Sequence, residues 1–383
     1  MRRPTRQAGF TLVELMVASM LASILLVALF RLLDITLDLW SKGETRRALV
    51  EQTAATAELL ASDLRALHNG KQGDFLCEWV PLDVDSDGIV DRIWPRLRFV
   101  RQASLVDVAR IAAEDLSPEI RKRAAELGVE PASLIPEEER RAAPQKSGLV
   151  QVVWTVVPAG RSADARGEGV LLRGEELLEA GSLGTFFDEG YFASDGQPRP
   201  GTTREVTGGL LWLGVQFATQ TSILWDGWSI GDRPRDTTTS WDAWNRGRPD
   251  AGVHVWNEPG AGMPRVGDTP LLPRRIRLEL EFERERDRLR RTRLLDFVDK
   301  ESGRFEVLNG DGLPRRDGQH ILVGSEWMRI VRVDGDQVVV RRGARGTQVR
   351  QHVAGSLVHF GSPIVVEVPV ALYSDDWSLE GSR

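Results

Sequence analysis

Several acidic residues gather in one short segment with the spacing of a cation-binding loop. Taken as positions 1, 3, 5, 7 and 9 of such a loop, the candidate ligands are Asp83, Asp85, Asp87, the main-chain carbonyl of Ile89, and Asp91. Gly88 stands at position 6, where calcium loops need a sharp turn. Trp94 occupies position 12, so the bidentate Glu of an EF-hand is missing. The segment therefore predicts either a Ca²⁺ site of modest affinity or a solvated acidic turn.

A second segment has the spacing of a hydrolase nucleophile. Residues 227–231 read Gly-Trp-Ser-Ile-Gly, which matches G-x-S-x-G. That motif requires a helix directly after the serine. The sequence Asp-Arg-Pro-Arg-Asp follows instead, and none of the five histidines stands in a known catalytic context. The sequence therefore predicts that the protein is not an enzyme.

The composition argues against two further classes of protein. The chain has 383 residues, with 50 basic and 56 acidic side chains and a formal net charge of −6. This balance argues against a general nucleic-acid binder, and 41% hydrophobic residues argue against wholesale disorder. Cys77 is the one cysteine of the sequence, which excludes an intrachain disulfide.

The N-terminus carries a membrane-spanning pattern. Three arginines stand among residues 1–9, and residues 10–30 contain a single charge, Glu14. At about 1.5 Å per residue this apolar segment is about 32 Å long, enough to cross a hydrocarbon layer of about 30 Å. Because the arginines precede it, the positive-inside rule places residues 1–9 in the cytoplasm and the following chain outside.

The residues at the start of this segment form a recognisable motif. Gly9-Phe10-Thr11-Leu12-Val13-Glu14 resembles the cleavage and methylation motif of type IV prepilins and of the pseudopilins of type II secretion. The resemblance implies that a prepilin peptidase cuts between Gly9 and Phe10 and that the new amine of Phe10 is methylated. Such a cut removes the basic leader and keeps the span as an anchor.

Glu14 is the fifth residue of the expected mature chain. A carboxylate inside a membrane helix costs on the order of 2–3 kcal/mol near the centre and usually has a partner. Residues 10–30 contain no Lys, Arg or His. The resemblance implies that Glu14 pairs with the Phe10 amine of a neighbouring subunit during filament assembly. The alternative is a snorkelling or protonated Glu in a plain anchor helix.

The rest of the chain predicts an α+β fold. Apolar residues at helical spacing continue from the span, and later segments change to strand periodicity. We expect a long N-terminal helix packed on an antiparallel sheet, a helical insertion and a C-terminal β-rich extension. The expected divisions are a leader 1–9, a helix 10–68 (membrane span 10–30), a head 69–293 with an insertion at 105–143, and an accessory segment 294–383.

The order of the predicted strands carries a second, looser resemblance. The strands QVVWTVV, GVLLRGEEL, GLLWLGVQFA and LPRRIRLELEF resemble the head of a J-type minor pseudopilin. This resemblance implies a pseudopilus subunit at or near the filament tip, anchored in the bacterial inner membrane with its head in the periplasm. Its partners are then other minor and major pseudopilins, the prepilin peptidase and methyltransferase, and secreted cargo.

Two alternatives to this function stay open. One is a minor pilin of a type IV pilus or DNA-uptake system. The other is a single-pass, membrane-anchored extracytoplasmic binding protein that forms no filament. A methylated Phe10 would support a filament subunit, and an intact Met1 would support a simple anchor.

Two further clusters each allow a structural and a functional interpretation. Six tryptophans lie in a Gly-, Pro- and Asp-rich region between residues 212 and 256. They either pin a long loop to the sheet or contact a partner, and the candidates for contact are Trp228, Trp241 and Trp244. Four arginines alternate along residues 284–290, which predicts a solvated edge strand or a surface for DNA or acidic partners.

Overall fold

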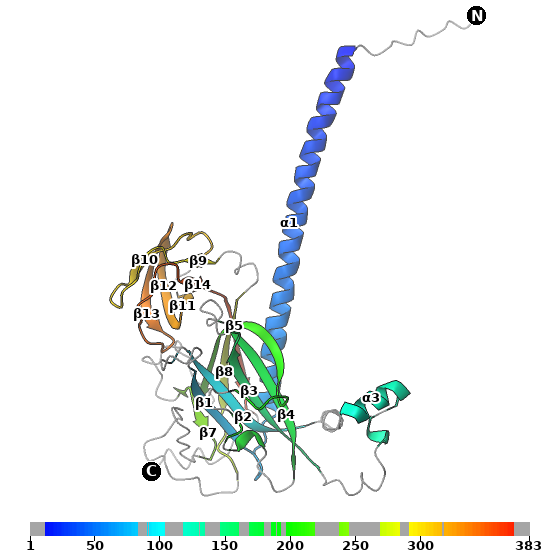
Figure 1. The fold of residues 1–383 in the computed structure, drawn as a ribbon, viewed down its shortest axis with the longest axis vertical. Coiled ribbons are helices and arrows are strands. Elements are labelled where there is room, and N and C mark those ends of the chain that lie inside the picture. Colours follow the sequence, from blue (N-terminus) through cyan, green and yellow to red (C-terminus); the bar gives the residue numbers. More distant parts are fainter. Residues whose placement is uncertain are drawn as a thin grey trace, which may run out of the picture. The chain divides into compact units, whose positions relative to one another are not determined.

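The computed structural model describes residues 12–82, 90, 92–103, 118–129, 131–134, 146–160, 168–179, 185–188, 190–192, 197–218, 237–244, 269–283, 291–315 and 318–370. The chain divides into two compact units, residues 1–54 and residues 55–383. Helix α1, Leu12–Arg65, begins in the first unit and ends in the second (Figure 1). The α+β fold expected from the sequence is confirmed, with an apolar N-terminal helix followed by antiparallel sheets.

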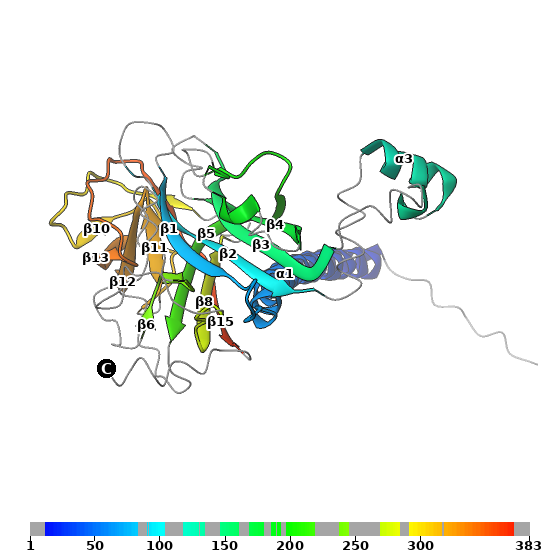
Figure 2. The ribbon, with the colours of Figure 1, turned by 90° about the horizontal axis from the view of Figure 1, so that it is seen from below.

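The head of the second unit is built on one large antiparallel sheet (Figure 2). Its strands run in the order β15-β8-β5-β4-β3-β2-β1-β7, and β6 pairs with β5. The strands are β1 Phe75–Leu82, β2 Arg92–Gln102, β3 Lys146–Pro158, β4 Gly169–Glu179, β5 Arg204–Ala218, β6 Thr237–Thr238, β7 Trp241–Asp242, β8 Arg275–Phe282 and β15 Ser362–Pro369. Among the described residues, three short helices accompany these strands: α3 Pro118–Leu127, η1 Pro131–Leu134 and η2 Thr185–Phe187.

The main core lies between this sheet and the last turns of α1. Ala57, Leu60, Ala61 and Leu64 of the helix are buried in one cluster with inward-facing side chains of the strands. On β8 the sequence IRLELEF alternates, so its aliphatic and aromatic residues enter the core while its glutamates face the opposite side of the sheet. The helix end and the sheet therefore form one hydrophobic unit.

A second sheet of six strands forms a separate group (Figure 1). Its order is β10-β13-β12-β11-β14-β9. The strands are β9 Thr292–Arg293, β10 Arg304–Glu306, β11 His320–Val323, β12 Glu326–Asp334, β13 Gln337–Ala344 and β14 Leu357–His359. Leu294 and Val307 form an isolated antiparallel β-bridge. The backbone amide of Leu295 donates to the carbonyl of Glu306, and that of Leu308 donates to the carbonyl of Arg293. These bonds join the two end strands, so the sheet closes into a small barrel around its own apolar core.

The barrel is inserted between two neighbouring strands of the head. β15 pairs with β8 along its whole length, from Ser362 opposite Phe282 to Pro369 opposite Arg275. The expected accessory segment 294–383 therefore needs a correction, because β15 belongs to the head sheet. The strand order could not be read locally, since the two paired strands are separated by the entire barrel.

The strands expected from apolar periodicity are present in β3, β4, β5 and β8. Within the expected insertion at 105–143, the described residues contain α3 and η1, which begin at Pro118 and Pro131. The sequence interpretation missed β1, whose Glu78 and Pro81 break its apolar pattern. Strand β1 is paired with β2 over eight positions, from Phe75 opposite Phe99 to Leu82 opposite Arg92.

Candidate functional site

The N-terminal part of α1 carries the candidate membrane anchor. Residues Leu15–Leu37 form a stretch of 23 residues that is long and apolar enough to cross a membrane, and this stretch is exposed. Glu14 lies on the same helix, one residue before the stretch, and its side chain is outside the described part of the chain. Gly9 and Phe10 also lie outside the described residues. The anchor is therefore a continuous helix whose apolar surface still needs a covering medium.

The other end of α1 is fastened to the sheet by buried charges. The carboxylate of Asp63 accepts hydrogen bonds from Arg173 Nε at 2.8 Å and Arg173 Nη2 at 3.0 Å. Arg101 Nε lies 3.2 Å from the same carboxylate, and Trp154 Nε1 donates to it at 3.0 Å. Glu175 completes the group by pairing with both arginines. The last turn of the helix is thus held by β2, β3 and β4 together.

The charges of this group are closely balanced. Burial opposes the charged form of Arg173, but the hydrogen bonds and charges of Asp63, followed by those of Glu175, raise its pKa. Asp63 is 4% exposed, so its negative charge lies in a medium where loss of a partner is costly. The role of Asp63 could not be predicted from the sequence, because a single aspartate on a helix gives no local signal of burial.

The head and the barrel meet at a buried arginine. Arg345 is the one non-glycine residue with a positive φ, 54°, among the residues that the structure describes. Its guanidinium lies 4.2 Å from the ring centre of Trp327 on β12 and 5.0 Å from that of Trp212 on β5. It also pairs with Glu279 at 2.5 Å and Glu281 at 2.8 Å. The Arg345 guanidinium therefore interacts with side chains of both sheets. These interactions offset the free-energy cost of its positive φ.

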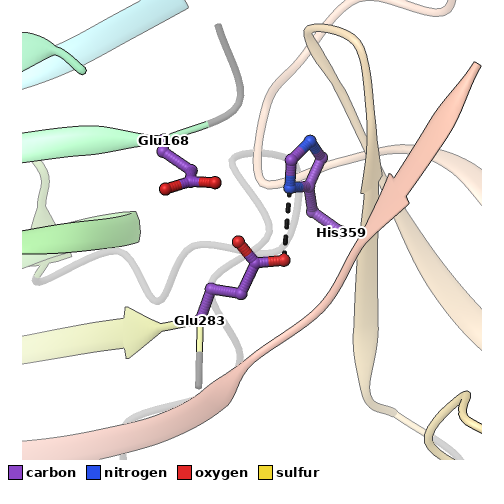
Figure 3. A group of neighbouring side chains, drawn as sticks. All are labelled: Glu168, Glu283 and His359. Carbon is purple, nitrogen blue, oxygen red and sulfur yellow. Dashed lines mark ion pairs between the residues drawn. The ribbon is translucent and has the colours of Figure 1, made fainter. Parts of the chain in front are cut away.

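Glu283, the residue directly after β8, belongs to a second group of charged side chains where the head sheet meets the barrel. Glu283 follows β8, Glu168 precedes β4, and His359 ends β14 (Figure 3). One ligand atom from each lies within 4.8 Å of the others. Arg291 forms ion pairs with both carboxylates, donating from Nε to Glu283 Oε1 at 2.7 Å. The group thus combines two carboxylates, one guanidinium and one imidazole.

Inside the barrel, Glu326 of β12 is bonded to two other segments, strand β13 and residues 350–352. Its carboxylate accepts two hydrogen bonds from Arg342, each of 2.7 Å, and lies 2.8 Å from His352 Nε2. The backbone amides of Gly343 and Arg350 donate to it at 3.0 Å. Burial favours the neutral acid, but the bonds from Arg342, His352 and these amides lower the pKa of Glu326 to about 2.

The interactions of ionised Glu326 make the stability of the barrel sensitive to acid. Because the pKa of Glu326 is lowered in the folded state, its stabilisation is complete above about pH 4.5 and is lost as the pH falls toward 2. Glu326→Gln is expected to cost about 3 kcal/mol at pH 7, since Arg342 loses its buried counter-charge, and much less at pH 2. Urea unfolding of the full chain in detergent at several pH values measures this difference. Glu301→Gln, at an exposed site, is the control, and an equal effect at both pH extremes would contradict the charge argument.

The two described tryptophans of the candidate partner surface are part of the head. Trp241 is 1% exposed, stacks near Phe217 and donates from Nε1 to the carbonyl of Leu271 at 2.8 Å. Trp244 packs against the core and donates to the carbonyl of Gly73 at 3.0 Å. Partner contact is therefore wrong for the buried Trp241, and both residues pin their segment to the sheet. Trp228 lies outside the described residues, as do residues 284–290.

The aspartates of the candidate calcium segment, with Ile89, are also outside the described residues. The structure does place the ends of the segment. Leu82 pairs with Arg92, so the two ends lie side by side at the end of a hairpin. Arg350 of the barrel donates from Nη2 to the carbonyl of Val90 at 2.6 Å.

Comparison with known proteins identifies the N-terminal segment. The family model described as the prokaryotic N-terminal methylation motif matches residues 4–30. No curated protein and no solved structure matches the chain. The matched residues include Gly9, Phe10 and Glu14 and most of the apolar stretch. The motif implies processing by prepilin peptidase and assembly with other pilins. The chain carries the N-terminal signature of type IV prepilins and pseudopilins, at the start of a helix that ends in a mixed α+β head.

Proposed function

We propose that the protein is a minor pseudopilin of a type II secretion system and acts as a structural subunit at or near the tip of the pseudopilus. In this function it catalyses no reaction. Prepilin peptidase removes residues 1–9, Phe10 is methylated, and the helix stays in the inner membrane with the head in the periplasm. The helix then leaves the membrane and packs into the filament with other minor and major pseudopilins.

One observation carries this proposal. The methylation motif at residues 4–30 runs directly into α1, which continues without a break to Arg65. A plain anchor needs about 20 residues to span the bilayer, whereas α1 has 54. The extra turns end at Asp63, whose carboxylate is bonded to arginines of the head sheet. A long helix fastened in this way suits a subunit that assembles through its helix.

The inserted barrel supports a minor subunit at the tip. Subunits repeated along a filament must pack closely around the helical core, and a bulky head limits how many copies can do so. A head enlarged by a six-stranded barrel fits best where neighbours are few. The apical position also leaves the head available for contact with secreted cargo.

Deletion in the source bacterium distinguishes this function from its alternatives. Loss of exported proteins with surface pili retained supports type II secretion. Loss of pili or of DNA uptake with export retained would instead assign the protein to a type IV pilus. If neither changes, and the protein co-purifies with no other pilin, a membrane-anchored binding protein without a filament is the better assignment.

We also propose that residues 83–91 bind Ca²⁺ on the periplasmic side. The pairing of Leu82 with Arg92 holds the ends of the segment together, which is the arrangement that a closed calcium loop needs. Four aspartates in this segment repel one another unless a cation is present. The site adds stability to the head and leaves the assembly mechanism unchanged.

Addition of Ca²⁺ is expected to raise the melting temperature of the full chain. With Kd of about 10⁻⁴–10⁻³ M, typical of extracellular modules, millimolar Ca²⁺ adds about 1 kcal/mol and roughly 2–4 °C. Scanning calorimetry with and without Ca²⁺ measures the shift. The double variant Asp85→Asn, Asp87→Asn should lose it, with Mg²⁺ as the matched ion control. A wild-type chain that shows no shift at millimolar Ca²⁺ would remove the site.

A further inference from the structure

The outer surface of the barrel carries an apolar patch. Single exposed apolar residues are ordinary on a protein surface, whereas a continuous group of them indicates a contact site. Three segments of the barrel contribute to the patch. Its four side chains and their exposed fractions are Leu295 44%, Phe297 56%, Leu308 58% and Val353 67%.

Leu295 and Leu308 are neighbours across two paired segments. The isolated bridge joins Leu294 to Val307, and both of these side chains enter the barrel core. The next residue on each segment therefore points outward. Because the amide of Leu295 donates to the carbonyl of Glu306, Leu295 and Leu308 are diagonal neighbours, about 7–8 Å apart.

Phe297 and Val353 meet on the other side of the same segment. The backbones of Val298 and His352 exchange two hydrogen bonds of 2.9 Å, and both side chains are buried. Their exposed neighbours Phe297 and Val353 consequently stand opposite each other. Leu295 is two residues from Phe297, so the four side chains form one patch across three adjacent segments, about 10 Å wide.

Arginines border the patch on the side of β10. Arg304 of β10 and Arg332 of β12 are both paired with Val339 of β13, one from each side (Figure 1). Beside them, Arg341 of β13 is paired with Arg329 of β12. All four arginines are exposed, and two of them stand directly opposite each other, where like charges repel. This part of the surface therefore favours a negatively charged partner.

Acidic residues on the same outer face do not cancel this charge. On β10, β12 and β13, all within the described chain, they are Glu306, beside Leu295, and Asp334, which pairs with Arg332 at 2.8 Å. Four positive charges thus face two negative ones. A nucleic acid would meet the charge but has no apolar face to cover the patch, and the chain as a whole carries a net charge of −6.

The size of the patch points to a small partner element. Its four residues expose on the order of 400 Å², whereas a standard interface buries about 800 Å² on each protein. The barrel is closed by the bonds between its end strands, so they give a partner strand no free edge to pair with. A width of about 10 Å instead matches a single α-helix laid on the sheet.

We propose that the barrel binds an amphipathic, acidic helix of a partner protein. The apolar face of that helix covers Leu295, Phe297, Leu308 and Val353, and its carboxylates lie over the arginines of β10, β12 and β13. The small area makes the contact a transient one. This inference is independent of the filament function, because it rests on the barrel surface and uses no part of α1.

A synthetic helix serves as the probe. It carries leucines at positions i, i+3, i+4 and i+7 with glutamates beside them, and the control peptide has lysines in place of the glutamates. The full chain is held in phosphatidylcholine nanodiscs, because detergent would cover the patch, and empty nanodiscs give the background. Fluorescence anisotropy should show the acidic peptide binding about tenfold more tightly than the basic one, with a smaller difference at high salt.

Two exposed sites separate the apolar and the charged contributions. Phe297→Ser should weaken binding of the acidic peptide about tenfold, because the largest apolar side chain of the patch is lost. Val365→Ser, on β15 of the head and 45% exposed, is the matched control and should bind normally. The double variant Arg304→Glu, Arg341→Glu should reverse the preference between the two peptides.

Three results would overturn the proposal. The first is a wild-type chain that binds the acidic peptide no better than Phe297→Ser does. The second is equal or tighter binding of the basic peptide. The third is a dimer of the chain alone, seen by mass photometry and lost in Phe297→Ser, since a second copy then covers the patch.

Discussion

Replacement of Glu14 by leucine is expected to abolish filament assembly while membrane insertion is kept or improved. Leucine removes a charge that costs on the order of 2–3 kcal/mol in a membrane helix, so the precursor should accumulate in the membrane at least as well as the wild type. In the proposed filament, assembly should fall because the methylated amine of a neighbouring Phe10 then loses its counter-charge in an apolar core. An unpaired buried charge costs about 3–5 kcal/mol, which corresponds to more than a hundredfold loss at each contact.

Two measurements separate these effects. Membrane fractionation gives the amount inserted, and shearing or cross-linking of filaments gives the amount assembled. Glu14→Asp keeps the charge and shortens the side chain by one methylene, so it should assemble partly. If Glu14→Leu assembles and supports export like the wild type, Glu14 is only a tolerated charge in an anchor helix.

Replacement of Asp63 by asparagine is expected to destabilise the head strongly. Asparagine has nearly the same shape and can still accept a hydrogen bond from Trp154, but it removes the charge that faces Arg101 and Arg173. The expected loss is about 3 kcal/mol of unfolding free energy. Urea unfolding of the full chain in detergent, followed by tryptophan fluorescence, measures it.

The same helix offers a matched control. Glu58 forms an ion pair with Arg65, and their side chains are 63% and 44% exposed. Glu58→Gln should leave unfolding almost unchanged, because solvent screens an exposed pair. If the two substitutions have equal effects, the burial of Asp63 does not determine its contribution.

The helices and strands whose apolar residues repeat at a regular spacing could be predicted from the sequence. The helix, β3, β5 and β8 each repeat apolar residues at their own spacing, and all are present. The barrel boundary could not be predicted, because the pairing of Ser362 with Phe282 joins residues that are far apart in the chain. Closure of the barrel by Leu294 and Val307 depends likewise on contacts that periodicity does not encode.

The chemistry of the site was predictable only where it forms a linear motif. Gly9, Phe10 and Glu14 are recognised by their spacing, and the match at residues 4–30 agrees with that interpretation. The glutamates of β8 look like the solvated face of a strand, because alternation alone does not show what covers a face. The barrel covers them, and Arg345 and Arg291 provide their counter-charges.

Mass spectrometry of the mature N-terminus shows whether prepilin peptidase processes this chain. The protein is isolated from membranes of its source cells and the N-terminal peptide is sequenced. We expect a chain that begins at Phe10 with a methylated amine, and a Gly9→Leu variant that keeps the leader. A wild-type chain that still begins at Met1, or one cut after the apolar stretch, would contradict it.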